Sequence, residues 1–196
     1  GRRALALRVD VADSGGVAEA VAKARRELGR IQILVNNAGI GEIAPLVQMT
    51  EAQWDRMIAV HLKGVFNCTR AVVEEMVASG WGRIVSTSSV AGLSGAPGFV
   101  HYSAAKAGIL GFTKALSLEL GATGVTVNAI APGMIDTPIL RKAAVTEEMI
   151  RRVVDRSPAK RIGRPEDIAA ACAYIVSEEA GFLMGQVLSP NGGTYL

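Results

Sequence analysis

The chain has 196 residues, of which 49% are hydrophobic and 20% are charged, and its formal net charge is +3. No apolar run approaches the ~18–20 residues of a membrane span, the basic residues are scattered rather than interleaved with aromatic ones, and no zinc-ligand spacing occurs. We therefore expect no membrane, nucleic-acid or metal-binding function, and two distant cysteines, Cys68 and Cys172, are typical of reduced thiols in a cytoplasmic globular protein.

In chain order, apolar runs alternate with helical patterns. Strands are predicted over residues 4–11, 31–39, 82–89, 124–133 and 185–193. Helices are predicted from Asp13 and Ser14 to Gly29, over 51–79 behind a capping box of Thr50 and Gln53, around Tyr102 as far as Gly121, and over about 146–156 and 166–178. Because these apolar strands lack alternation and lie between helices, we predict one α/β domain over residues 1–196 with a doubly wound, Rossmann-like parallel sheet.

Small and polar residues follow the predicted strands. They are Asp10 and Val11, Asn36 to Gly39, Ser86 to Ser89, and Pro132 and Gly133. Since the carboxyl ends of parallel strands meet at one edge of a sheet, these residues predict a site there for a flat polar ligand.

Tyr102 and Lys106 lie one helical turn apart, on one face of their helix. A positive charge within about 4–6 Å favours the phenolate, so this spacing predicts a tyrosine that can exchange a proton. The alternative is a packed tyrosine beside a solvated lysine. Ser89, at a predicted strand end, strengthens the catalytic interpretation because its hydroxyl could hold a substrate oxygen, whereas Ser86 and Ser88 suit bonds to the backbone.

Five segments carry a resemblance to a known family. They are "NNAG" (36–39), "GRIVSTSSVAG" (82–92), "YSAAK" (102–106), "VNAIAPGMIDTP" (127–138) and "GRPEDIA" (163–169). In this order and at these spacings they resemble the short-chain dehydrogenase/reductase family, over essentially the whole chain, with most similarity to its 3-oxoacyl-(acyl carrier protein) reductases.

The resemblance implies roles for individual residues. Tyr102 would be the proton donor or acceptor, Lys106 would lower its pKa and bond the nicotinamide ribose, and Ser89 would orient the substrate carbonyl. The implied cofactor contacts are Asp10, Val11, Asn37, Ala38, Gly39, Tyr102, Lys106, Pro132, Gly133, Ile135 and Thr137. Residues 137–160 resemble the segment that covers the substrate. The cofactor would be NADP or NAD, and the choice between them stays open.

Two features depart from the family pattern. His61, in "VHLKGVF", stands where the family usually has Asn, and we interpret it as a catalytic residue that holds a relay water or, alternatively, as a residue that fills a helix interface. The glycine-rich phosphate turn is absent, and "GIGEIA" (39–44) does not replace it because Pro45 follows and no helix is expected before Thr50. We therefore expect an N-terminally truncated domain that lacks its first strand-helix-strand unit, so that residues 4–11 have no neighbouring strand.

The resemblance implies an NAD(P)-dependent oxidoreductase that interconverts a ketone and a secondary alcohol, with a 3-oxoacyl thioester as the expected substrate. Alternatives are a dehydrogenase of a steroid, sugar or cyclic alcohol, or a non-catalytic nucleotide-binding relative. The apolar residues around the helices at 51–79 and Tyr102 also favour a homotetramer, as the family implies.

Overall fold

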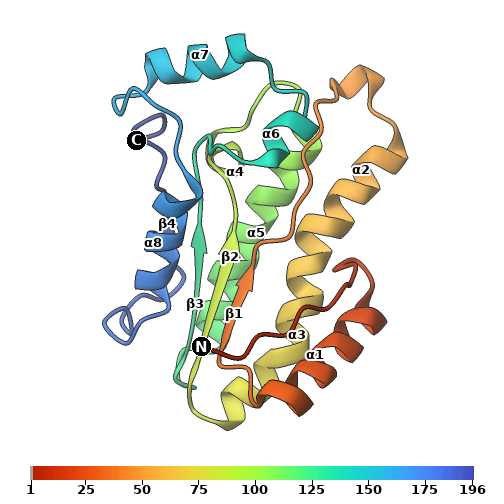
Figure 1. Cartoon of the computed structure of the whole chain (residues 1–196), viewed down its shortest axis with the longest axis vertical. Coiled ribbons are helices and arrows are strands. Elements are labelled where there is room, and N and C mark those ends of the chain that lie inside the picture. The colour runs from red at the N-terminus through yellow and green to blue at the C-terminus, as the bar shows by residue number, and fades with distance from the viewer. Residues whose placement is uncertain (1) are drawn as a thin grey trace.

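Four parallel strands lie at the centre of the protein, as a computed structural model that describes residues 2–196 shows. They are β1 (Ile33–Asn36), β2 (Gly82–Thr87), β3 (Val125–Ile130) and β4 (Val187–Leu188), and they lie in the order β1-β2-β3-β4 (Figure 1). β3 is buried along its whole length and β2 along all but its last residue, as expected for central strands of a parallel sheet that is covered on both faces. The predicted parallel α/β sheet is confirmed.

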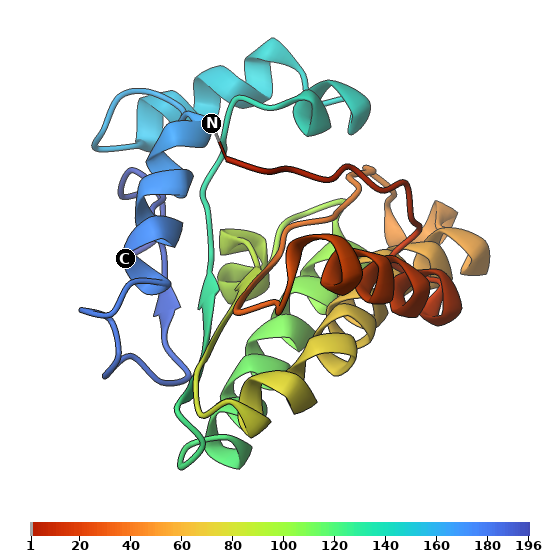
Figure 2. The same cartoon turned by 60° about the horizontal axis from the view of Figure 1, so that its bottom comes forward.

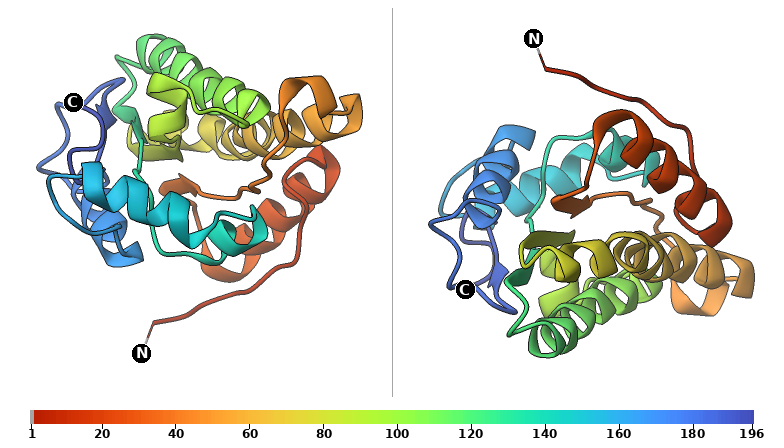
Figure 3. Two further views of the ribbon diagram at one scale, coloured as in Figure 1. Left: turned by 90° about the horizontal axis from the view of Figure 1, so that it is seen from above. Right: turned by 90° about the horizontal axis from the view of Figure 1, so that it is seen from below.

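Helices pack on both faces of this sheet. Their bounds are α1 (Ser14–Leu28), α2 (Glu51–Ile58), α3 (Gly64–Ala78), α4 (Val90–Ser94), α5 (Val100–Glu119), α6 (Pro138–Lys142), α7 (Glu147–Arg156) and α8 (Pro165–Ile175). A core that includes Val72, Met76 and Ile84 joins α3 to one face of the sheet, with α1 and α5 packed against it. A second core of Val85, Ile130 and Ile175 joins α8 to the opposite face. The two views of Figure 3 show these layers, which make the sheet doubly wound.

The predicted helix over 51–79 is continuous but not uniform. Thr50 and Gln53 form the predicted capping box, and α2 runs into a π-helical turn, Ala59–Lys63, before α3 continues the same axis. Single π-helical turns inside α-helices often occur at functional sites, and His61 lies within this one. No helix in residues 2–196 is long and apolar enough to cross a membrane.

Three predictions about elements are wrong. Residues 4–11 form no strand and run as an extended trace outside the sheet towards α1 (Figures 1 and 2). A strand persists by pairing its backbone, and no strand lies beside this segment within the described residues.

The last strand covers only Val187–Leu188, because Gly185 on one side and Pro190 on the other interrupt the ladder. No helix was predicted directly after Ser89, yet residues 90–94 form the short helix α4, which the Ser89 side chain caps.

The unpaired edge at β1 was expected and is present. β1 is the outer strand of the sheet, and Ile33 and Val35 on it are 44% and 45% exposed. The remaining strands end earlier than predicted, since the polar residues after them leave the ladder and line the edge of the sheet.

Candidate active site

Tyr102 and Ser89 come together at the carboxyl edge of β2. Ser89 follows the strand and begins α4, and Tyr102 lies in the first turn of α5. Burial raises the pKa of Tyr102, while a hydrogen bond with the Ser89 hydroxyl lowers it. Ser89 Oγ also accepts a hydrogen bond of 3.1 Å from the Ala91 amide.

Lys106 reaches the same place from one turn further along α5. Its Nζ lies 5.5 Å from the centroid of the Tyr102 ring and donates a 2.6 Å hydrogen bond to the Thr87 carbonyl. The side chain is almost fully buried, and this desolvation lowers the pKa of Lys106 to about 7. The lysine therefore lies beside the tyrosine, as its spacing predicted, but it loses much of its charge near neutral pH.

Of the two neighbouring serines for which backbone bonds were predicted, Ser88 makes one and Ser86 instead bonds to a side chain. The Ser88 hydroxyl donates to the Lys106 carbonyl over 2.8 Å and thereby joins β2 to α5. Ser86 Oγ accepts from the Asn36 side chain over 3.2 Å. Thr87, which sequence reasoning did not single out, contributes the carbonyl that orients Lys106, and its place as the last residue of β2 is the signal that could have indicated it.

His61 lies against Tyr102 and the loop after β1. Its ring is 1% exposed and meets the Tyr102 ring edge-on, with 5.3 Å between centroids. Nε2 lies 2.8 Å from the Ile40 carbonyl oxygen and 3.1 Å from the Ile40 amide, whereas Nδ1 has no partner within residues 2–196. Burial, and secondarily the charge of Lys106, lower the pKa of His61 to about 4, so the ring is neutral at pH 7.

Gly39 is required at its position by this histidine. A Cβ on residue 39 would lie 2.6 Å from His61 Cε1, closer than any stable contact. His61 therefore fixes both the path and the composition of the loop at 39–40. That His61 holds a relay water stays a prediction, because the hydrogen-bond partners of its ring within residues 2–196 are the backbone atoms of Ile40.

Four of the predicted cofactor residues line one pocket of about 640 Å³. They are Asp10, Val11, Ala38 and Gly39, and the lining also includes Arg8 and Arg56, which sequence reasoning missed. Asn37 lies beside them and accepts a 3.2 Å hydrogen bond from the Thr87 hydroxyl.

The other predicted cofactor residues follow β3. Gly133 approaches Asn191 so closely that a Cβ would lie 2.9 Å from its Cα, which fixes the turn begun by Pro132. Ile135 pairs with Gly163, and Thr137 directly precedes α6. These four residues lie at the same edge of the sheet but outside the 640 Å³ pocket.

The pocket fits the adenosine end of a nicotinamide dinucleotide. Small residues, Ala12, Ala38, Gly39 and Ala59, leave its lining open to a flat ring. Asp10 Oδ2 and the Val11 amide have no hydrogen-bond partner within residues 2–196, which leaves an acceptor and a donor for the edge of a purine. A glycine-rich turn that opens a helix, the usual phosphate site, is not found in the part of the chain that the structure describes. "GIGEIA" leads only into a 3₁₀ turn, Leu46–Gln48.

Comparisons with known proteins agree with this geometry. Residues 1–195 match the sequence model of a protein family described as "Enoyl-(Acyl carrier protein) reductase". The chain is 48% identical over 184 residues to nodulation protein G of Azospirillum brasilense, covering 94% of this chain and 74% of that one. It is 43% identical over 187 residues to acetoacetyl-CoA reductase of Cupriavidus necator, covering 95% and 75%. It is 38% identical over 190 residues to 3-oxoacyl-[acyl-carrier-protein] reductase of Escherichia coli, covering 97% and 77%.

A solved structure shares the fold. A gluconate 5-dehydrogenase from Burkholderia cenocepacia, in complex with NADP and tartrate, aligns with a TM-score of 0.91 at 32% identity, over 95% of this chain and 73% of that one. The chain thus spans about three quarters of the length of each of these proteins.

Proposed function

Since the chain belongs to the short-chain dehydrogenase/reductase family of oxidoreductases, we propose that it interconverts a ketone and a secondary alcohol with NADP or NAD, and that its substrate is a 3-oxoacyl thioester. The observation that carries this proposal is the convergence of Ser89, Tyr102 and Lys106 at one edge of the sheet, beside a pocket that fits adenosine.

In the proposed mechanism the protein controls the proton. NAD(P)H, when bound, supplies the hydride for the carbonyl carbon. The Ser89 hydroxyl donates a hydrogen bond to the carbonyl oxygen, and the Tyr102 hydroxyl gives that oxygen its proton. Burial raises the pKa of Tyr102, so the phenol keeps its proton until it can transfer it to the substrate oxygen.

Lys106 and His61 support the tyrosine in different ways. Lys106, held by the Thr87 carbonyl, lies close enough to the ring to stabilise the phenolate that remains after proton transfer. His61 packs against the edge of the same ring and holds the loop at Ile40. His61 thus holds the phenol ring in position, and Lys106 stabilises the negative charge on its oxygen.

The segment over 137–160 is proposed to cover the substrate. Its helix α6 closely approaches the loop after β1, because a Cβ on Gly41 would lie 3.1 Å from both Ile139 and Ala143. This contact supports a covering role for α6, since it brings the segment next to the loop that follows β1. Closure of such a segment excludes water from hydride transfer.

An absorbance assay at 340 nm tests the proposal. Acetoacetyl-CoA, gluconate and a cyclic alcohol would each be offered with NADPH or NADH, or with the oxidised cofactor for the alcohols. We expect turnover of acetoacetyl-CoA to exceed that of the others, as the names of two similar proteins suggest. Turnover of gluconate alone would favour a sugar dehydrogenase, and cofactor binding without any turnover would favour the non-catalytic alternative.

A further inference from the structure

Residues 2–12 make few hydrogen bonds to the rest of the fold. Residues 2–10 have no regular structure and are mostly exposed, and Asp10 takes part only in local bonds to Ala12 and Asp13. Within the described residues, the first hydrogen bond from this segment to another element is made by Val11, whose carbonyl accepts from Asn67 Nδ2 on α3 over 2.8 Å.

One face of α3 accommodates Val11. Asn67 is 5% exposed, so its amide donates in a region from which water is largely excluded. Gly64, three residues earlier, lies on the same face of the helix, and a Cβ there would lie 2.8 Å from Val11 Cγ2. The glycine leaves space for the valine side chain while the asparagine holds its carbonyl.

The position of Val11 defines one side of the 640 Å³ pocket. Asp10, Val11 and Ala12 all line it, facing Ala38 and Gly39 across from them. Within residues 2–196 no strand pairs with residues 10–11, and the bond from Asn67 holds the Val11 backbone beside the free Val11 amide and Asp10 Oδ2.

We propose that Asn67 is a positioning residue for the adenine end of the dinucleotide, acting through Val11, and that Gly64 provides the space this arrangement needs. The inference rests on the proposed function in one respect, namely that residues 10–11 contact adenine. It predicts that a change at Asn67 weakens binding of the adenosine half and spares chemistry at the nicotinamide half.

The test compares Asn67→Asp with Asn128→Asp. Asn128 is the matched control, because its Nδ2 also donates over 2.8 Å to a backbone carbonyl, that of Leu183, and the residue is also buried. In both variants a carboxylate replaces a buried amide donor. Affinity for ADP-ribose would be measured by calorimetry, and turnover would be measured with reduced nicotinamide mononucleotide, which has no adenosine.

We expect Asn67→Asp to weaken ADP-ribose binding about tenfold and to leave kcat/KM with the mononucleotide unchanged. Asn128→Asp should lower the melting temperature without a comparable loss of ADP-ribose affinity. Gly64→Ala gives a second route, since it displaces Val11 while Asn67 remains. Hydrogen exchange at residues 10–12 should accelerate in Asn67→Asp and Gly64→Ala, and not in Asn128→Asp.

Unchanged ADP-ribose affinity in Asn67→Asp would overturn the proposal, as would wild-type protein that does not bind ADP-ribose. Equal losses with the dinucleotide and the mononucleotide would also overturn it, because they would indicate general damage. A wild-type protein that binds ADP-ribose but reduces no carbonyl would instead refute the proposed reaction and leave the role of Asn67 supported by its own result.

Discussion

At the scale of single residues, burial has a larger effect on the pKa values of Tyr102 and Lys106 than the charge that each presents to the other. Desolvation raises the pKa of the phenol and lowers the pKa of the amine, so both neutral forms are favoured. A phenolate that forms on Tyr102 during the reaction would favour the charged form of Lys106, because opposite charges at this distance stabilise each other. The pair is therefore suited to a charge that appears only during reaction.

Replacing Tyr102 with Phe should remove the proton donor while leaving the ring and its contact with His61 in place. We expect the rate of carbonyl reduction to fall by about 10²–10⁴, the usual contribution of a positioned acid-base group. Cofactor affinity, followed by fluorescence of the reduced nicotinamide, should change little. Wild-type turnover in this variant would contradict the mechanism.

Lys106 should make stability depend on pH in a defined direction. Its pKa of about 7 in the fold lies below the ordinary value of 10.5, so the unfolded chain binds more protons between these two values. Stability therefore rises with pH across this window, and below pH 7 the full cost of burying the ammonium is present. Lys106→Met should remove that rise, as urea unfolding at pH 7 and pH 9.5 would show. Lys114→Met, at an exposed position on the same helix, is the control, and a rise that persists in Lys106→Met would refute the assignment.

His61 should tolerate replacement only by a residue that can bond Ile40. His61→Asn retains a donor and an acceptor for the Ile40 backbone and should keep activity, whereas His61→Ala leaves those groups unpaired and should slow the reaction. Steady-state rates of the three forms check this. Equal rates would mean that the ring only fills space.

At the scale of elements, features set by short sequence spacing could be predicted, whereas contacts between distant segments could not. The capping box at Thr50 and the helical turn between Tyr102 and Lys106 follow from spacing alone, and both are present. The apolar run at 4–11 has the composition of a strand, yet a strand also needs a neighbour, which composition does not encode. The bond from Asn67 to Val11 was likewise not predictable, because it joins residues far apart in sequence, and no residue pattern indicated the π-helical turn at His61.

The absence of a paired strand beside residues 4–10, within residues 2–196, has a measurable consequence. Residues 4–10 lack a ladder, while β2 is paired on both sides. We expect backbone amides in 4–10 to exchange with solvent orders of magnitude faster than those of Ile84 and Val85. Slow exchange in this segment would indicate that it pairs with a strand in solution.

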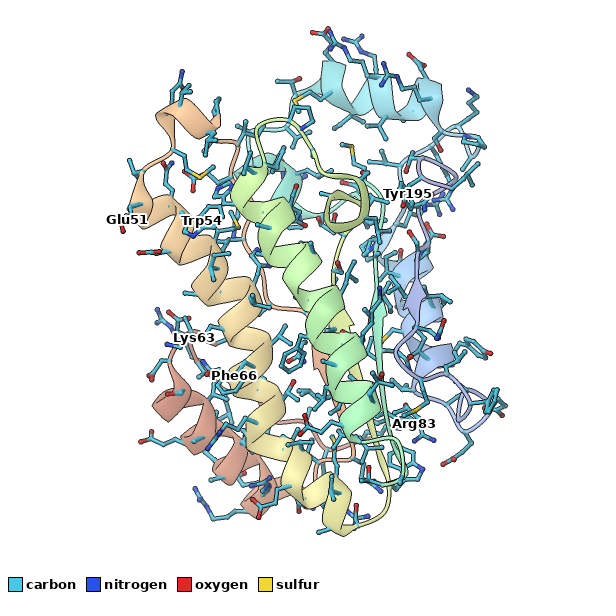
Figure 4. The ribbon with its side chains drawn as sticks, turned by 180° about the vertical axis from the view of Figure 1, so that it is seen from behind. Glu51, Trp54, Lys63, Phe66, Arg83 and Tyr195 are labelled. Atoms are coloured by element: carbon cyan, nitrogen blue, oxygen red, sulfur yellow. The ribbon has the colours of Figure 1, made fainter. Side chains whose placement is uncertain are left out.

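At the scale of the whole molecule, large apolar side chains are exposed on several elements, and two groups of them bear on association. Phe66 on α3 is 46% exposed and is labelled in Figure 4 on the helical side of the molecule, and Leu118 on α5 is 85% exposed. Ile33 and Val35 lie on the outer strand β1. The first group supports the proposed homotetramer, since helices can pair face to face, whereas the second exposes a backbone edge as well as side chains.

These two groups should produce different kinds of association. Phe66→Glu should dissociate a defined oligomer and leave a soluble smaller species, which light scattering would report as a fall to a fixed lower mass.

Val35→Lys should act instead on open-ended aggregation, because a charge on a sheet edge disfavours further strand pairing. We expect the wild-type chain to aggregate with time and to bind NADH or NADPH weakly, and Val35→Lys to slow that aggregation without changing the defined mass. A wild-type chain that stays soluble at one mass and binds the cofactor at micromolar concentration would contradict this, and would require that the β1 edge is covered in solution.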